Sequence, residues 1–265
     1  MGSLNREDVA FRRAIDEDWP FLEKLWIQDL DDVESLKLMK KHNLINQNMF
    51  VAEVNREVVA MLSIIPCILN CGRIVAGYYL YGVTTDRSYR KRNIMTWFLR
   101  NMNQLCRDQK AEFILTIPAT QEAECYYLKR GFTDAFRSIK TISFSKDLVW
   151  STEPVSTVSI SCLKSICRDF EGINVYFPSN VDNYFYEELL RSRHCLLHLG
   201  RRNGKICCYV VSHESENGSE ILLTGHSHDE IYEATTHQRG LIKWLTESMI
   251  TVDGNGYILT GNIPF

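Results

Sequence analysis

The sequence predicts an α/β protein in which a mixed, mostly antiparallel sheet is flanked by helices. The first observation behind this is that strand-like apolar runs and segments with helical apolar spacing follow one another over the first 145 residues. Such interleaving of strands and helices is typical of an α/β domain. The second is that 45% of the 265 residues are hydrophobic, enough for a sizeable core in one large domain or two small ones.

The first elements are a strand, a helix and a strand meander. VAFRRAI (residues 9–15) alternates as a short strand does, and DEDWPFLEKLWIQDL (residues 16–30) begins with acidic residues and continues with apolar residues at helical spacing. Two β-rich runs on either side of Asn55 and Arg56 predict a hairpin, and VAGYYLYGVTT (residues 75–85) predicts a further strand. An antiparallel meander therefore follows the first helix.

The remaining elements of this half are two helices and the strand between them. NIMTWFLRNMNQLCRDQ (residues 93–109) carries apolar residues on one helical face, and AEFILTIPA (residues 111–119) is a buried type of strand. QEAECYYLKRGF (residues 121–132) predicts a short helix that ends at Gly131. One more strand completes the predicted order by about residue 145.

Charge and composition exclude several classes of function. A formal charge of −3 gives no general reason to expect nucleic acid or an anionic membrane as a partner. The N-terminus lacks a secretory signal and no apolar run approaches about 20 residues, so a cytoplasmic protein is expected. Nine cysteines without a Cys-x-x-Cys pair signal neither a disulfide framework nor zinc. His226 and His228 are read as solvent-facing, so no metal is expected.

A basic turn joins the strand at residues 75–85 to the helix that follows. It contains Arg87, Arg90, Lys91 and Arg92. The start of a helix leaves backbone N–H groups unpaired and carries the positive end of the helix dipole, which together suit a phosphate or pyrophosphate. A solvated charged face is the alternative interpretation, and a nucleic-acid patch is disfavoured because no neighbouring basic surface accompanies the turn.

Three blocks of sequence carry a resemblance to a known family. YLYGVTTDRSYRKRNIMTWFL, FILTIPA and CYYLKRGF stand in this order and spacing. Together they resemble the GNAT superfamily of acetyl-CoA-dependent N-acetyltransferases, above all the Eis-like and related bacterial branch. The resemblance covers roughly residues 8–145, and it implies a GNAT fold and acetyl-CoA as cosubstrate.

The resemblance also implies where acetyl-CoA binds. The family's pyrophosphate loop, Arg/Gln-x-x-Gly-x-Gly/Ala, falls on residues 90–95, where Arg90 fits but Asn93 and Met95 replace glycine and a small residue. Asparagine tolerates a left-handed backbone better than most residues. The implied cofactor-binding set is the backbone of Val83, Thr84 and Thr85 for the pantetheine arm and Arg90, Lys91, Arg92, Asn93, Ile94, Met95 and Thr96 for the pyrophosphate.

By the same resemblance, Tyr127 is the general acid that protonates the leaving thiolate, because it stands four residues before Gly131 in the pattern Tyr-x-x-x-Gly-Phe. Tyr126 is the fallback, and the alternative is that both are ordinary helix aromatics. A tyrosine with a pKa near 10 holds its proton at neutral pH, so it can donate it.

Several carboxylates are candidates for the base that deprotonates the amine. One is Glu53, and the others lie in the acidic run DLDDVES, with Asp29, Asp31, Asp32 and Glu34. The acidic run favours a cationic amine, unless it is simply a solvated loop. Eis-like enzymes suggest the C-terminal carboxylate, here that of Phe265.

The second half of the chain repeats the plan of the first. LLHLGRRNGKICCYVVSHESENGSEILLTG followed by THQRGLIKWLTESM matches the earlier hairpin, strand and helix, with a helix start at residues 238–241. The predicted domains are a GNAT domain over residues 1–148, a linker over 149–156 and a degenerate GNAT-like lobe over 157–265. The second lobe would shape the acceptor pocket.

The function expected from the sequence is transfer of an acetyl group from acetyl-CoA to a primary amine of a small molecule or peptide, directly within a ternary complex. The alternative is a catalytically silent acyl-CoA-binding or sensor protein, and transfer to a hydroxyl or of a longer acyl chain is a further one. Aminoglycosides, polyamines, amino sugars and peptides all fit as acceptors. A homo-oligomer is left open, since the lobes can pack within or between chains.

Overall fold

The computed structural model describes residues 4–30, 32–70, 73–144, 146–168, 174–191, 194–215, 218–226 and 231–245. The helices are α1 (Trp19–Leu30), α2 (Val33–Lys41), α3 (Leu44–Asn48), α4 (Ile94–Asp108), α5 (Gln121–Leu128), α6 (Ile160–Arg168) and α7 (Ser179–Arg191). The strands are β1 (Val9–Arg13), β2 (Met49–Val54), β3 (Glu57–Asn70), β4 (Ile74–Thr85), β5 (Phe113–Thr116), β6 (Thr133–Phe144), β7 (Val149–Pro154), β8 (Asn174–Tyr176), β9 (Cys195–Arg202), β10 (Lys205–Ser215), β11 (Gly218–His226) and β12 (Ile231–Trp244).

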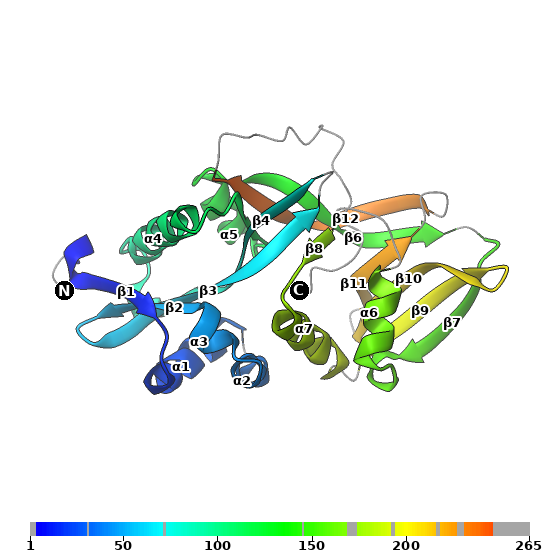
Figure 1. The fold of residues 1–265 in the computed structure, drawn as a ribbon, viewed down its shortest axis with the longest axis horizontal. Helices are drawn as coiled ribbons and strands as arrows, with labels where there is room; N and C mark the ends of the chain where they lie inside the picture. Colours follow the sequence, from blue (N-terminus) through cyan, green and yellow to red (C-terminus); the bar gives the residue numbers. More distant parts are fainter. Residues whose placement is uncertain are drawn as a thin grey trace.

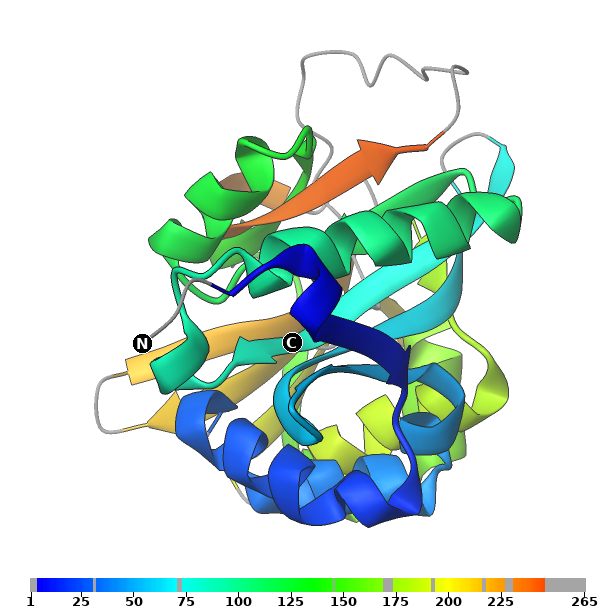
Figure 2. The same cartoon turned by 90° about the vertical axis from the view of Figure 1, so that its left-hand side faces the viewer.

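These strands form two sheets. The larger runs β1-β2-β3-β4-β5-β12-β6, with β8 on β3, and the smaller runs β11-β10-β9-β7. Neighbours in both sheets are antiparallel except β4 and β5, which are parallel. The predicted mixed, mostly antiparallel sheet flanked by helices is therefore confirmed. Figure 2 shows α4 and α5 over one face of the larger sheet and α1 to α3 over the other, while Figure 1 shows the smaller sheet beside it, beyond α6 and α7.

The predicted hairpin and helices of the first half are present. Asn55 and Arg56 link β2 to β3 with φ angles of 51° and 67°, so both adopt the left-handed backbone of a tight hairpin turn. The helix predicted from residue 93 is α4, which buries the face that carries Ile94, Phe98 and Met102. Burial of each such side chain contributes about 1.5–3 kcal/mol relative to exposure.

A hydrophobic cluster fills each face of the larger sheet. On one face Leu22, Leu25 and Trp26 of α1 pack against the sheet together with Tyr184 and Phe185 of α7. On the opposite face the apolar side of α4 packs with Tyr127 of α5. Because α7 belongs to the second half of the chain, the two halves share one core.

The helix predicted near residues 238–249 is wrong: residues 231–244 form strand β12, which lies between β5 and β6. Its end is buried on both faces of the sheet. Leu241 belongs to the hydrophobic cluster under α4 (the α4 cluster), and Ile242 belongs to the cluster under α1 and α7 (the α1 cluster). A strand buried on both faces reads as a continuous apolar run rather than an alternating one, and such a run resembles a helical segment. Its partner strands β5 and β6 lie far back in the chain, beyond the reach of local patterns.

The segment predicted as a linker also differs in the structure. Residues 149–154 form β7, which pairs with β9, and Val155 is buried directly after it. The run STEPVSTVS (residues 151–159), rich in Ser, Thr and Pro, predicts a linker, but β7 is an edge strand, where proline is tolerated. The proposed lobes over 1–148 and 157–265 stay a prediction as folding units, although β12 of the second completes the sheet of the first.

Candidate active site

The central feature of the site is the divergence of β4 from β5. The two strands pair from Gly77 opposite Phe113 to Leu80 opposite Thr116, where β5 ends, while β4 continues to Thr85. Among the described residues no strand covers the β5 side of β4 beyond Leu80. An open strand edge can pair with an extended ligand through backbone hydrogen bonds. The predicted Val83, Thr84 and Thr85 lie on this open stretch.

A β-bulge bends β4 within the open stretch. Tyr81 pairs with Ser63 and Thr84 with Met61, so Gly82 and Val83 together oppose one residue of β3. Gly82 has a φ of +60°, and a Cβ there would lie 2.8 Å from Cζ3 of Trp26. Glycine is required at this position by both its backbone angle and its closeness to α1.

The start of α4 is open toward the same region. Asn93 precedes the helix with a φ of 64°, and its side chain makes no capping hydrogen bond, whereas Asp32 caps α2 and Thr120 caps α5. The first N–H groups of a helix have no partner within it, so those of α4 are left for a ligand. Asn93 thus takes the left-handed backbone that glycine would take. Met95 packs against the α4 cluster.

The basic side chains of the turn are largely engaged by α1. Nη2 of Arg90 donates to both carboxylate oxygens of Asp29, at 2.6 and 2.7 Å, and Nε donates to the carbonyl of Thr85 at 3.1 Å. Arg87 donates to the carbonyl of Gln28 at 2.9 Å. Burial alone would raise the pKa of Asp29, but hydrogen bonds from Thr84 and Arg90 hold it below its ordinary value. Arg90 therefore ties the turn to α1.

Arg92, the fourth basic residue of this turn, lies over the ring of Tyr89, 5.2 Å from its centroid. Lys91 is exposed and has a φ of 61°. Both residues directly precede Asn93 and the start of α4.

Tyr127 reaches the point where β4 and β5 separate. It is 5% exposed, packs on Phe132 with ring centroids 5.2 Å apart, and its hydroxyl contacts Thr116, the last residue of β5. Thr116 in turn donates to the carbonyl of Leu80 at 3.1 Å. Burial raises the pKa of Tyr127 above its ordinary value, so the hydroxyl keeps its proton at neutral pH.

Tyr126 occupies a different environment. The guanidinium of Arg130 lies over the Tyr126 ring, 3.4 Å from the ring centroid. The hydroxyl of Tyr126 lies 3.4 Å from the hydroxyl of Thr96, in the first turn of α4. Tyr126 therefore belongs to the gap between α4 and α5, and only Tyr127 lies at the end of β5.

The predicted bases are not brought together at the divergence. Glu53 lies on β2, separated from β4 by β3, and accepts hydrogen bonds from Arg12 at 2.8 and 3.0 Å. Glu34 pairs with Lys37 at 2.6 Å, and Asp32 caps α2. Among the described residues of the acidic run, Asp29 is in direct contact with the open stretch of β4, through Thr84.

Some predicted site residues lie outside the described residues. These are Asp31, His228 and Phe265, and the side chain of His226.

A cationic hollow of about 620 Å³ opens between α4, α5 and β12. Its lining includes the cations Arg100, Lys129, Arg130 and Lys243, and none of its lining residues is acidic. Arg130 donates to Thr96 at 2.7 Å, and burial lowers the pKa of Lys243. Such a hollow beside an open helix start fits the phosphate groups of coenzyme A.

These cations were not among the site residues predicted from the sequence. Lys129 and Arg130 stand inside the block CYYLKRGF, so the motif itself was the signal. Lys243 could be placed there only by the pairing of β12 with β5, which no local pattern indicates.

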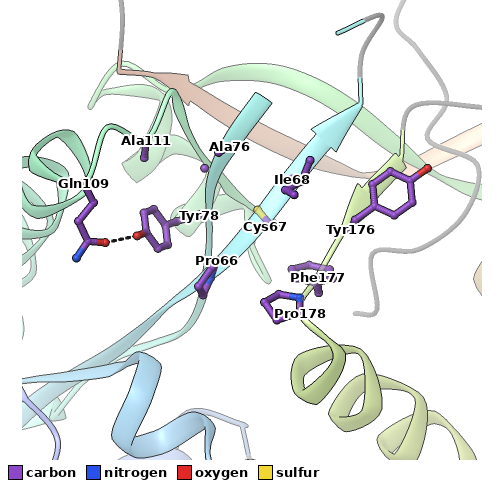
Figure 3. A pocket seen from close by; sticks show the side chains of 11 residues that line it. Pro66, Cys67, Ile68, Ala76, Tyr78, Gln109, Ala111, Tyr176, Phe177 and Pro178 are labelled. Carbon is purple, nitrogen blue, oxygen red and sulfur yellow. Dashed lines mark hydrogen bonds between the residues drawn. The ribbon is translucent and has the colours of Figure 1, made fainter. Parts of the chain in front are cut away.

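A second hollow, of about 330 Å³, lies at the far end of β3 and β4. Figure 3 shows Tyr78 hydrogen-bonded to Gln109 on one side and Tyr176, Phe177 and Pro178 on the other. The β4 residues in its lining, Ala76 to Tyr78, come before the divergence at Leu80. It is therefore separate from the candidate active site.

Among the described residues, no helix is long and apolar enough to cross a membrane.

Comparisons with known proteins agree with this geometry. Residues 10–135 match the GNAT acetyltransferase domain. A search of curated proteins finds no match. Solved structures with a similar fold include a GCN5-related N-acetyltransferase from Anabaena variabilis (TM-score 0.62, 16% identity, 90% of this chain and 73% of that one). Another is Eis1 from Mycobacterium abscessus (TM-score 0.59, 9% identity, 89% and 73%).

A GCN5-related N-acetyltransferase from Kribbella flavida shares the fold at a TM-score of 0.61 and 12% identity, over 90% of this chain and 72% of that one. The split between β4 and β5, the open start of α4 and the match over residues 10–135 lead to one conclusion. Residues 10–135 form a domain of the GNAT family of N-acetyltransferases, whose cosubstrate is acetyl-CoA.

Proposed function

We propose that this protein transfers the acetyl group of acetyl-CoA directly to a primary amine of a small molecule or peptide, within a ternary complex. The observation that carries the proposal is the position of Tyr127 beside Thr116, where β5 ends and the edge of β4 becomes open. A donor bound along that edge has its reacting end close to a hydroxyl that is protonated at neutral pH.

Each part of the site has one task in this proposal. The backbone of Val83, Thr84 and Thr85 binds the pantetheine arm, and the open start of α4 binds the pyrophosphate. Backbone N–H groups of β4 polarise the thioester carbonyl. Tyr127 gives its proton to the sulfur as the carbon–sulfur bond breaks. Holding both reactants in one complex lowers the entropy cost of the reaction.

The cationic hollow supplies charge that the turn does not. Arg90 is neutralised by Asp29, whereas Lys129 and Arg130 face no acidic side chain in the hollow. We assign these two residues to the phosphates of the donor. The chain's own residues therefore supply both a dipole and full charges for an anionic ligand.

The test is a titration of acetyl-CoA and of free coenzyme A into the purified protein by calorimetry. The wild type should bind both in the micromolar range, and Lys129→Ala with Arg130→Ala should weaken binding by roughly tenfold per charge lost. Lys205→Ala, an exposed lysine in the smaller sheet, is the matched control and should change nothing. An affinity in the double variant equal to that of the wild type would contradict this assignment.

An activity assay distinguishes an N-acetyltransferase from the alternative, a catalytically silent acyl-CoA-binding protein. Thiol release should depend on an added amine such as spermidine, kanamycin, glucosamine or a lysine-containing peptide. Binding of acetyl-CoA without transfer to any of these amines would favour a silent acyl-CoA sensor. A faster reaction with a longer acyl-CoA would instead show that acetyl-CoA is not the preferred acyl donor.

A further inference from the structure

A chain of polar side chains begins at β4 on the face of the sheet opposite Tyr127. Tyr81 follows Leu80, the last β4 residue paired with β5, and its hydroxyl oxygen lies 3.0 Å from that of Tyr184 on α7. Tyr184 hydrogen-bonds Glu188, which lies one turn further along the same helix. None of these three residues has a role in the acetyl transfer proposed above.

The environment of Glu188 suits a group that gains and loses a proton. Ser35 of α2 donates to Oε1 of Glu188 at 2.6 Å, and Oε2 is buried with no partner among the described residues. Ser35 also lies 2.7 Å from Asp32, yet its hydroxyl has one hydrogen and serves one carboxylate at a time. When Glu188 carries a proton it can donate to Ser35, which then donates to Asp32.

The path continues to the protein surface. Asp32 pairs with Arg191 at 2.6 Å, and these side chains are 41% and 37% exposed. The hydroxyls and carboxylates therefore form a continuous series from Tyr81 of β4, through Tyr184, Glu188 and Ser35, to solvent at Asp32. Such hydrogen-bonded networks can move a proton.

The charges around Glu188 are consistent with this role. Burial raises the pKa of Glu188 above its ordinary value, with hydrogen bonds from Ser35 and Tyr184 acting against burial, and so brings it closer to neutral pH. Burial also raises the pKa of Tyr81 and Tyr184 well above 10, so both stay protonated. The groups that face Glu188 are Tyr79 and Tyr81 from β4, Ser35 and Asp32 at the start of α2, and Tyr184 and Arg191 from α7 itself. The neighbouring Glu187 instead pairs with Lys41 and His42.

We propose that Glu188 is the terminal acceptor of the proton that the substrate ammonium must lose, reached through the hydroxyls of Tyr81 and Tyr184. This inference rests on the proposed function. The ammonium gives a proton to Tyr81, Tyr81 gives its own to Tyr184, and Tyr184 gives its own to Glu188. The neutral amine then forms the carbon–nitrogen bond while the carbon–sulfur bond breaks.

Tyr127 protonates the departing sulfur and is reprotonated by the second proton that the nitrogen loses. Glu188 releases its proton to solvent through Ser35 and Asp32. One proton is released for each ammonium acetylated, and no oxidant or other reactant is needed.

The experiment compares Glu188→Gln with Glu187→Gln. Both variants remove one carboxylate from α7, but only the first removes it from the path. The rate of thiol release from acetyl-CoA is measured from pH 5 to pH 10 with spermidine, kanamycin, glucosamine and a lysine-containing peptide, using the best acceptor. Acetyl-CoA affinity is measured in parallel.

Glu188→Gln should lower kcat/KM by about 100-fold at pH 7 and shift its acidic limb toward the pKa of the free amine. Its acetyl-CoA affinity should not change, and Glu187→Gln should stay within about twofold of the wild type in both rate and pH profile. Tyr184→Phe keeps the packed ring and removes the hydroxyl, so it should reproduce the loss if Glu188→Gln does not fold.

Three results would overturn the inference. The first is a pH profile of Glu188→Gln that equals that of the wild type, or the same result for Tyr184→Phe if Glu188→Gln does not fold. The second is a loss of kcat/KM in Glu187→Gln as large as that in Glu188→Gln. In both cases wild-type turnover stands, so the proposed function survives. The third is no transfer by the wild type to any of the four amines, which contradicts the proposed function and this inference together.

Discussion

At the scale of single residues, the two adjacent tyrosines of α5 show how position decides the chemistry available to a side chain. Tyr127 is buried at the end of β5, whereas Tyr126 is held between Arg130 and Thr96. The motif alone favoured Tyr127, and the contact with Thr116 adds a physical reason. The acid role requires a proton that persists at neutral pH, which burial ensures for Tyr127.

Tyr127→Phe should lower kcat by about 100-fold or more while acetyl-CoA affinity stays unchanged, because only the proton donor is removed. Tyr126→Phe is the matched control and should stay within about threefold of the wild type. Because burial raises the pKa of Tyr127, no alkaline loss of kcat from this residue is expected below about pH 10. Equal kcat values for the two variants would remove the acid role from Tyr127.

Asp86 makes the turn before α4 sensitive to acid. Its pKa is about 2, because Lys24 and Ser88 donate hydrogen bonds to the carboxylate. A folded-state pKa below the unfolded value contributes stability above about pH 4, and that contribution is lost as the pH falls toward 2. Asp86→Asn should therefore cost about 1–2 kcal/mol of unfolding free energy at pH 7, and the difference should decrease as the pH falls through about 2. Urea unfolding at several pH values measures this, and a difference independent of pH would contradict it.

At the scale of elements, the bulge in β4 shapes the open edge through Gly82. Gly82→Ala should destabilise the protein because the new Cβ would lie 2.8 Å from Trp26 at a φ of +60°. Gly204 provides a matched control, with a φ of +79° and no atom of the described residues within 4 Å of its Cβ position. Gly204→Ala should cost about 1–2 kcal/mol for the backbone alone, and Gly82→Ala about 1–3 kcal/mol more. Equal costs in urea unfolding would show that the contact with Trp26 is relieved without strain.

The elements that the sequence predicted well are those whose signals are local. The hairpin at Asn55 and Arg56 and the amphipathic α4 are set by turn residues and helical spacing, so each could be located without tertiary information. β12 could not, because its partners β5 and β6 lie far back in the chain and its end is buried on both faces.

The same division applies to the site. The open edge and the start of α4 lie within a single motif, and Asn93 adopts the left-handed backbone expected of the glycine it replaces. The cations Arg100 and Lys243 and the series from Tyr81 to Glu188 join segments that are distant in sequence. No spacing rule links such segments, so only the fold could bring them together.

At the scale of the whole molecule, the smaller sheet and α7 are inserted between two neighbouring strands of the larger sheet. β6 precedes this insertion and β12 follows it, and the two strands pair from Phe144 opposite Ile231 onward. α7 returns to the larger sheet and buries Tyr184 and Phe185 against it. The inserted segment therefore contributes to the core of the larger sheet and is not an independent layer.

A protein that ends at residue 148 should consequently fail to fold, although it contains the whole family match. It lacks β12, so β5 and β6 have no strand between them, and the buried Leu241 and Ile242 are missing from both clusters. Unpaired strand edges and exposed apolar surface promote aggregation.

A protein in which a four-residue turn replaces residues 146–229 keeps β12, because Phe144 and Ile231 are already opposite each other. It should remain folded, with a lower Tm from the loss of α7. Circular dichroism and size-exclusion chromatography distinguish the two, and cooperative unfolding of the protein ending at 148 would show that β12 is dispensable to the sheet.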